Sequence, residues 1–178
     1  MSDEKARMFN ALRIVYPLSR FVVLAEVANS TGWARQGFCD ALAVSLLPSG
    51  AFALHGFEIK LARSDWLREL KRPEKSERFK RFCTRWYLLC TEGVAQASEL
   101  PPGWGMLVLR DGALHTAKRA PKLTPEPVTA GMWAGLVRRA FAQSAANSMQ
   151  PCRLPKPLHY NCRAGGLCSR SRLLETAQ

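Results

Sequence analysis

Residues 40–61, DALAVSLLPSGAFALHGFEIKL, contain two apolar runs separated by three turn-forming residues. The runs extend from Ala41 to Leu47 and from Ala51 to Leu61, and they have the length and composition of β-strands. The segment Pro48–Gly50 favours a tight turn between them. The stretch therefore predicts an antiparallel β-hairpin, around which the rest of the chain can be arranged.

The register of this hairpin decides which side chains meet. A turn centred on Ser49 places Asp40 directly opposite Glu58, and opposite residues of antiparallel strands have Cβ atoms about 4.5–5.5 Å apart. Side chains alternate between the two faces of a strand, so Lys60 shares the face of Glu58. The hairpin would thus gather two carboxylates and one ammonium group on one face of a sheet, provided that the register is not shifted by one residue.

Two facing carboxylates repel each other unless a cation lies between them. Mg²⁺ or Mn²⁺ suits such a site, because these ions bind one or two carboxylates and keep several waters. An ion there could polarise a phosphoryl oxygen and lower the pKa of a bound water. Lys60 could orient that water or stabilise charge on the phosphate. The alternative is a cluster of charged side chains on a half-exposed sheet.

The segments around the hairpin resemble a known family. Residues 40–66 (DALAVSLLPSGAFALHGFEIKLARSDW), 67–90 (LRELKRPEKSERFKRFCTRWYLLC) and 99–109 (ELPPGWGMLVL) occur in the order found in the PD-(D/E)XK nuclease superfamily. The resemblance is to its small bacterial and phage members, including nucleases similar to DNA-repair proteins, and covers about residues 15–122. It implies an α/β fold with a mixed central β-sheet flanked by helices, the restriction-endonuclease-like core.

The resemblance also implies roles for individual residues. Asp40 and Glu58 would be the metal ligands and Lys60 the catalytic lysine. Cys39 stands where the family has a proline before the aspartate. Many members carry a further acid near the metal, and Glu26, a lone acid ending an apolar stretch, is the candidate. The alternative is an acid that lies at the end of an element and faces water. Arg35, in the loop before Asp40, could contact a phosphate, although a solvated arginine is the alternative.

The remaining elements follow from periodicity and from turn residues. Residues 21–27 form a strand or a buried helix, and periodicity does not decide between them. We expect a nuclease-like domain over residues 1–122, and a C-terminal helix with a basic, cysteine-containing tail over residues 123–178. The other expected elements are helices over 3–13, from Trp66 and over about 74–84, strands over 86–90, 105–110 and 113–118, the last two joined at Asp111-Gly112, and a helix over 129–143 capped by Thr129.

The chain is strongly basic, with 26 Lys and Arg against 14 Asp and Glu, a formal charge of +12. Residues 103–178 contain 11 of the basic residues and 3 of the acidic ones, so the excess is concentrated towards the C-terminus. Such a charge favours a polyanionic partner, in the first place DNA. Lys71, Lys75 and Lys80, in the charged segment after the hairpin, are candidates for contacts with the nucleic-acid backbone. The alternative for them is a solvated helix face.

The tail contains Cys152, His159, Cys162 and Cys168, a spacing that fits a structural zinc site. An iron–sulfur cluster and a basic tail with free thiols are the alternatives. The other cysteines lie in apolar runs, and we expect them to be buried and reduced. The sequence has no secretory signal and no membrane-length apolar stretch, so we expect an intracellular, cytoplasmic protein without a membrane partner.

These patterns favour a Mg²⁺- or Mn²⁺-dependent nuclease that hydrolyses phosphodiester bonds in DNA, in bacterial or phage DNA processing or repair. RNA is an alternative substrate. The main alternative is a nuclease-fold protein that binds nucleic acid without cutting it. A third possibility is a phage-type protein that acts on a host protein through the 129–143 helix. A homodimer is a further possible assembly.

Overall fold

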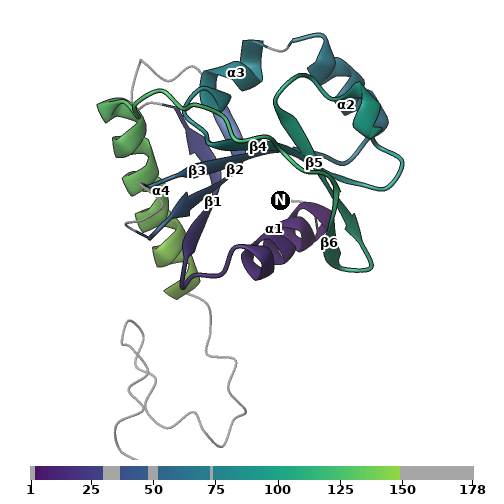
Figure 1. Cartoon of the computed structure of the whole chain (residues 1–178). Helices are drawn as coiled ribbons and strands as arrows, with labels where there is room; N and C mark the ends of the chain where they lie inside the picture. Colours follow the sequence, from purple (N-terminus) through teal and green to yellow (C-terminus); the bar gives the residue numbers. More distant parts are fainter. Residues whose placement is uncertain (1–2, 30–36, 48–51, 73, 149–178) are drawn as a thin grey trace, which may run out of the picture. The chain divides into compact units, whose positions relative to one another are not determined.

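Six strands form one mixed β-sheet in which the order across the sheet is the order along the chain (Figure 1). Strands β1, β2 and β3 are antiparallel, β3, β4 and β5 are parallel, and β6 is antiparallel to β5. The predicted mixed sheet with helices is therefore confirmed. The strands are β1 (Phe21–Ala28), β2 (Phe38–Ser45), β3 (Leu54–Lys60), β4 (Arg85–Thr91), β5 (Trp104–Arg110) and β6 (Ala113–Lys118).

This computed structural model describes residues 3–29, 37–47, 52–72 and 74–148. Residues Met1–Ala140 form one compact unit and residues Phe141–Gln178 another, and the fold described below is that of the first. Segment 123–140, which lies beyond the predicted domain boundary at residue 122, is part of this first unit. No helix in the described part of the chain is long and apolar enough to cross a membrane.

The β2–β3 hairpin has the predicted register. Its pairs run from Val44 with Leu54 to Ala41 with Phe57, and one further step in each strand brings Asp40 and Glu58 to corresponding positions. The turn residues themselves lie outside the described ranges. Strand β3 begins at Leu54 rather than Ala51, because Phe52 has a φ angle of 54°, which an extended strand does not contain.

Helices cover both faces of the sheet. Helix α1 (Asp3–Val15) packs on one face, where Phe9 and Leu12 join a buried cluster with Phe57 and Leu89. Helices α2 (Arg63–Leu70) and α3 (Glu74–Lys80) lie on the other face with the first turns of α4 (Ala130–Ser148). The buried residues Trp66, Phe79 and Met132 anchor these helices to that face.

The 21–27 segment, for which strand and helix were both open, is a strand. Two predicted helix boundaries need correction, and the first is that of α2, which begins at Arg63 instead of Trp66. Helix α3 ends at Lys80, short of residue 84, because the chain tightens into i−3 hydrogen bonds: Cys83 N–H donates to Lys80 O at 2.9 Å. The Thr129 cap is confirmed, since Thr129 Oγ1 accepts from Met132 N–H at 3.2 Å.

The predicted β5–β6 hairpin turns at Asp111 and Gly112. Their φ angles are 51° and 78°, as a two-residue turn with both central residues left-handed requires. Gly112 adopts this conformation without steric cost, and Asp111 is one of the residue types that tolerate it. Asp111 and Gly112 therefore determine the hairpin that forms one edge of the sheet.

Gly56 gives a test of how closely the sheet and its neighbours pack. A Cβ at this position would lie 2.2 Å from the Trp86 ring, so Gly56→Ala should lower the unfolding free energy by about 3 kcal/mol through overpacking. Gly37→Ala, where the new Cβ would lie 4.0 Å from Phe79, is the matched control and should change it by less than about 1 kcal/mol. Urea denaturation measures both, and equal stability of the two variants would contradict the packing described here.

Candidate active site at the end of strand β3

A cleft of about 400 Å³ opens where β3 ends and α2 begins. Three residues predicted from the hairpin, Asp40, Glu58 and Lys60, all line it. The structure therefore brings together the set that the register predicted. Its lining consists of Asp40, Glu58, Ile59, Lys60, Asp65, Arg68, Glu69, Arg72 and Lys75.

Asp40 lies at the point where β2 and β3 separate. The strand pairing ends at Ala41 and Phe57, and at the next step the Asp40 side chain takes the place of a backbone acceptor: Ile59 N–H donates to Asp40 Oδ2 at 2.9 Å. The other oxygen, Oδ1, accepts from Lys5 Nζ of α1 at 2.8 Å. The Asp40 carboxylate is thus held between the two strands and a helix of the opposite face.

Lys60 lies between two carboxylates. Its Nζ is 2.6 Å from Glu58 Oε1 and 2.8 Å from Glu69 Oε2. Glu58 is 5% exposed and Glu69 is 7% exposed, so both acids are buried. Glu69 comes from α2, and its Oε1 accepts a hydrogen bond from Ser76 of α3 at 2.8 Å. Buried charges need such partners, because desolvation is costly for an unpaired ion.

Glu69 is a site residue that sequence reasoning missed. It lies in a run of alternating charges in which most side chains are exposed, and such a run usually marks a solvated helix face. A weak indication was present, because residues three apart share a helix face and Glu69 follows the apolar Trp66 at that spacing. Both residues are buried on the inner face of α2.

The environment shifts the pKa of each member of this group. Burial, together with the nearby Asp40 charge, raises the pKa of Glu58 from 4.5 to about 7, despite Lys60. Burial alone would lower the pKa of Lys60, but the charge of Glu58 and hydrogen bonds to both carboxylates outweigh it, so the pKa is raised. Burial acts to raise the pKa of Glu69, but hydrogen bonds from Lys60 and Ser76 leave it lowered. Lys60 and Glu69 are therefore both charged at neutral pH.

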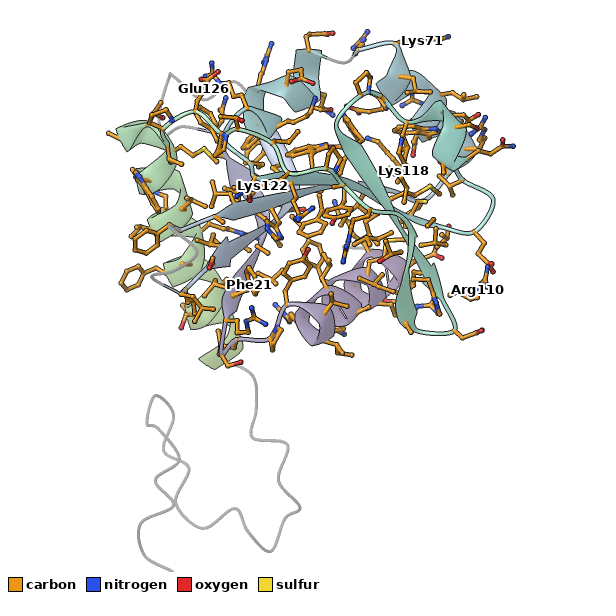
Figure 2. All side chains as sticks on the ribbon, in the orientation of Figure 1. Phe21, Lys71, Arg110, Lys118, Lys122 and Glu126 are labelled. Atoms are coloured by element: carbon orange, nitrogen blue, oxygen red, sulfur yellow. The ribbon has the colours of Figure 1, made fainter. Side chains whose placement is uncertain are left out.

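Basic residues form the rim of the cleft. Arg68, Arg72 and Lys75 line it, and Lys75 Nζ is also 3.7 Å from Glu69 Oε2. Of the three lysines predicted to contact nucleic acid, Lys75 is the one that lines the cleft. Lys80 pairs with Glu77 at 2.7 Å, and Lys71 follows the last turn of α2, where its side chain points outward (Figure 2).

The other predicted site residues lie elsewhere. Glu26 has a φ angle of 49°, its carboxylate lies 3.9 Å from Arg139 of α4, and it does not line the cleft. Arg35 and the tail residues Cys152, His159, Cys162 and Cys168 lie outside the described residues. Cys39, Cys83 and Cys90 are buried free thiols, as predicted.

A larger hollow, of about 850 Å³, lies at the opposite end of β3, near His55. Its lining includes Lys122 and Glu126 from the segment before α4 (Figure 2). Glu126 is the sole acid among its described lining residues, and it lies 3.6 Å from Arg81. The described lining of this hollow lacks a pair of facing carboxylates, so the smaller cleft is the better candidate for a metal site.

The oxygen ligands in the cleft suit some metal ions better than others. No group of three or more His, Cys, Asp or Glu side chains in the described ranges is arranged to hold a metal. Asp40 and Glu58 supply two carboxylates that face the same cleft. This is a poor donor set for zinc, but it fits Mg²⁺, which binds through one or two carboxylates and completes its shell with water and substrate oxygens.

Comparisons with known proteins extend the description of the fold. No family model and no curated protein sequence matches the chain. A solved structure of a protein of unknown function from Silicibacter pomeroyi is similar, with a TM-score of 0.53 and 22% sequence identity over 88% of this chain and 92% of that one. At this identity the similarity concerns the fold alone.

The raised pKa of Glu58 predicts a pH dependence of stability. The folded chain holds this proton more tightly than the unfolded chain, so the contribution of Glu58 to the unfolding free energy falls as the pH rises from 4.5 to about 7. The fall is on the order of 3 kcal/mol. Glu58→Gln does not titrate, so the unfolding free energy of wild type minus that of the variant should decrease over this range.

Urea denaturation in EDTA at pH 5, 6, 7 and 8 measures this difference. His55, whose pKa burial lowers to about 4, contributes the opposite slope in an overlapping pH range, but it is present in both proteins and cancels. A difference that stays constant from pH 5 to pH 8 would show that Glu58 ionises normally.

Proposed function

We propose that the chain is a divalent-metal-dependent nuclease that hydrolyses phosphodiester bonds in DNA, and that its sheet is a restriction-endonuclease-like core of the PD-(D/E)XK type. The observation that carries the proposal is the convergence of Asp40, Glu58 and Lys60 in one cleft with a basic rim. The resemblance of residues 15–122 to small nucleases of that superfamily supports it.

Asp40 and Glu58 are the residues that would hold Mg²⁺ or Mn²⁺. A bound ion would supply positive charge at the phosphoryl oxygen and acidify a water molecule. Glu58 has a pKa of about 7, and a carboxylate must be deprotonated to act as a ligand. Metal affinity should therefore rise with pH through neutrality.

Lys60 acts as a fixed cation in this proposal. Its raised pKa keeps it protonated at neutral pH, so it donates hydrogen bonds and does not serve as a base. An ammonium group has three N–H donors, and two of them are directed at Glu58 and Glu69. The third can donate to a phosphate oxygen or to the attacking water, where a positive charge stabilises the transition state.

The basic rim of the cleft supplies affinity for the phosphate backbone of DNA and does not distinguish between base sequences. Arg68 and Lys75 have side chains that are 72% and 57% exposed, and they can reach a phosphate backbone above the cleft. Contacts of this kind release counterions, so binding should weaken steeply as salt rises. The net charge of +12 acts in the same direction.

Cleavage of defined DNA tests the proposal. Purified protein with Mg²⁺ or Mn²⁺ should cut single-stranded, duplex or branched DNA, and EDTA should stop the reaction. Asp40→Asn, Glu58→Gln and Lys60→Met should each lower the rate at least 100-fold, because each removes charge from the reacting centre. Glu77→Gln, which removes an exposed charge on α3, is the matched control. Wild-type protein that leaves every DNA intact with both metals would refute the proposal.

One observation favours a second candidate, a protein that binds nucleic acid without cutting it. Both proposed metal ligands are already paired with lysines, Asp40 with Lys5 at 2.8 Å and Glu58 with Lys60 at 2.6 Å. A cleft neutralised in this way does not need a metal. In this case the basic rim would be the functional part.

Salt-dependent binding distinguishes the two candidates. For a binding protein, affinity for a DNA oligonucleotide should be the same in EDTA and in Mg²⁺, and no products should form. The double variant Arg72→Ala with Lys75→Ala should weaken binding about tenfold at low salt and reduce the slope of log affinity against log salt by roughly two. Fluorescence anisotropy measures both quantities. Affinity that depends on Mg²⁺, or a slope unchanged in the variant, would contradict this candidate.

A further inference from the structure

We infer that the larger hollow, at the opposite end of β3 from the cleft, binds an unpaired stretch of a DNA strand. A base would stack on aromatic side chains of one wall, and phosphates would contact basic side chains of the other. The volume of about 850 Å³ lies in the range of ligand-binding pockets. The choice of DNA as the partner rests on the function proposed above, but binding in the hollow does not require cleavage.

Two exposed aromatic side chains form the first wall. Phe52 is 59% exposed and Trp133 is 38% exposed, and both line the hollow. Their ring centroids are 6.1 Å apart and their planes meet at 89°, so they form an edge-to-face pair. The bases of an unpaired strand have flat faces that stack on such rings whatever the base is. This wall therefore offers a stacking surface without base specificity.

The backbone of Phe52 holds its ring in this position at a local cost. Its φ angle of 54° is left-handed, a conformation that bulky residues rarely adopt. Burial of the ring in the core would offset this cost, but the ring is largely exposed. Glycine would take up the same conformation without strain. The folded chain thus has little need of an aromatic ring here, which favours a role in binding.

Basic side chains form the second wall. Arg85 of β4 and Lys122 of the segment before α4 line the hollow (Figure 2). Within the described ranges, neither of them forms an ion pair with a carboxylate. The acid in the described lining, Glu126, lies 3.6 Å from Arg81, which offsets its charge. The wall therefore carries uncompensated positive charge that suits a phosphate.

Hydrogen bonds hold this basic wall in place. Leu123 N–H, next to Lys122, donates to Thr84 O at 2.9 Å. The guanidinium group of Arg85 donates to Ala120 O, and its remaining N–H groups are available to a phosphate. Because the wall is already formed, a strand that binds there meets a smaller ordering cost.

The pairing of an aromatic wall with a basic wall favours an unpaired strand over a duplex. Bases inside a duplex are stacked on one another, so their faces are not open to side chains. An unpaired strand exposes base faces together with its phosphates, and proteins bind such strands through aromatic side chains beside basic ones.

A basic surface that holds any polyanion is the competing explanation. In that case Arg85 and Lys122 would bind phosphates, and the aromatic pair would take no part. The net charge of +12 gives every DNA some affinity for the chain, so total affinity does not separate the two explanations. They differ in what happens when the bases are removed from the strand.

Fluorescence anisotropy with labelled strands makes this comparison. The full-length chain is titrated in EDTA with a dT oligonucleotide of about 12 nucleotides and with an abasic strand of the same length. The abasic strand keeps its phosphates but has no bases. Wild-type protein should bind the dT strand about tenfold more tightly, because stacking is lost in the other. Equal affinity for the two strands would overturn the inference.

Variants of the aromatic wall locate the stacking. Phe52→Gly removes the ring and the backbone strain together, so it should weaken dT binding about tenfold without lowering the midpoint of urea denaturation. Trp133→Leu should also weaken dT binding, and neither change should affect the abasic strand. Ile14→Ala, which truncates an exposed apolar side chain on α1, is the control and should bind both strands normally. Wild-type affinity for dT in both aromatic variants would overturn the inference.

A pair of lysine variants tests the basic wall. Lys122→Gln should weaken the binding of both strands about threefold, because a phosphate contact is lost with or without bases. Lys118→Gln removes an equal charge from β6, outside the described lining of the hollow (Figure 2), and should have a smaller effect. Equal losses in the two variants would show that Lys122 acts through net charge alone and would overturn its assignment to a phosphate.

These measurements separate the inference from the proposed function, because EDTA prevents metal-dependent cleavage during binding. If the wild-type chain does not cut DNA but loses base-dependent binding in Phe52→Gly, the nuclease proposal fails and the inference stands. If the chain cuts DNA while Phe52→Gly and Trp133→Leu bind the dT strand normally, the nuclease proposal stands and the inference fails.

Discussion

The pairing of Ala41 with Phe57 is the constraint on which the site depends. It is the last pair of the β2–β3 ladder. Beyond it, Ile59 N–H donates to the Asp40 side chain instead of to a backbone carbonyl of a continuing strand. A shift by one residue would turn Glu58 and Lys60 towards the apolar face covered by α1 and would send Phe57 into the cleft. Burial of Phe57 in the α1 cluster therefore fixes the position of the carboxylates on the other face.

Electrostatics then determine what the cleft can hold. Glu58 and Glu69 are buried, Lys60 is partly buried between them, and each carboxylate lies beside the Lys60 ammonium group. Asp40 has such a partner in Lys5, which comes from the opposite side of the sheet. In the cleft, Asp40, Glu58 and Glu69 thus each lie beside at least one lysine. The two carboxylates beside Lys60 raise its pKa, and burial raises the pKa of Glu58.

The sequence was informative where chemistry is local. The turn-forming residue types at positions 48–50 and the alternation of side chains sufficed to predict the hairpin register, and Asp111-Gly112 sufficed for the second hairpin. Contacts between segments that are distant in the sequence could not be predicted from local patterns. Lys5 bonds to Asp40, which is 35 residues away in the sequence. Glu69 lies in a charged helix, and only the packing of α2 against the sheet shows that it is buried. Glu26 was a candidate because it is a lone acid in an apolar run. In the structure its φ angle is left-handed, and its carboxylate lies beside Arg139.

The agreement between chain order and sheet order has a consequence for synthesis on the ribosome. Each strand from β2 to β6 pairs with the strand made just before it, so the sheet can grow from one edge without waiting for a distant segment. Asp40, Glu58 and Lys60 all lie within the first three strands and would emerge early. Glu69 and Ser76 emerge only with α2 and α3. During this interval a nascent chain would carry the acidic pair and its lysine without the contact that holds the lysine in place.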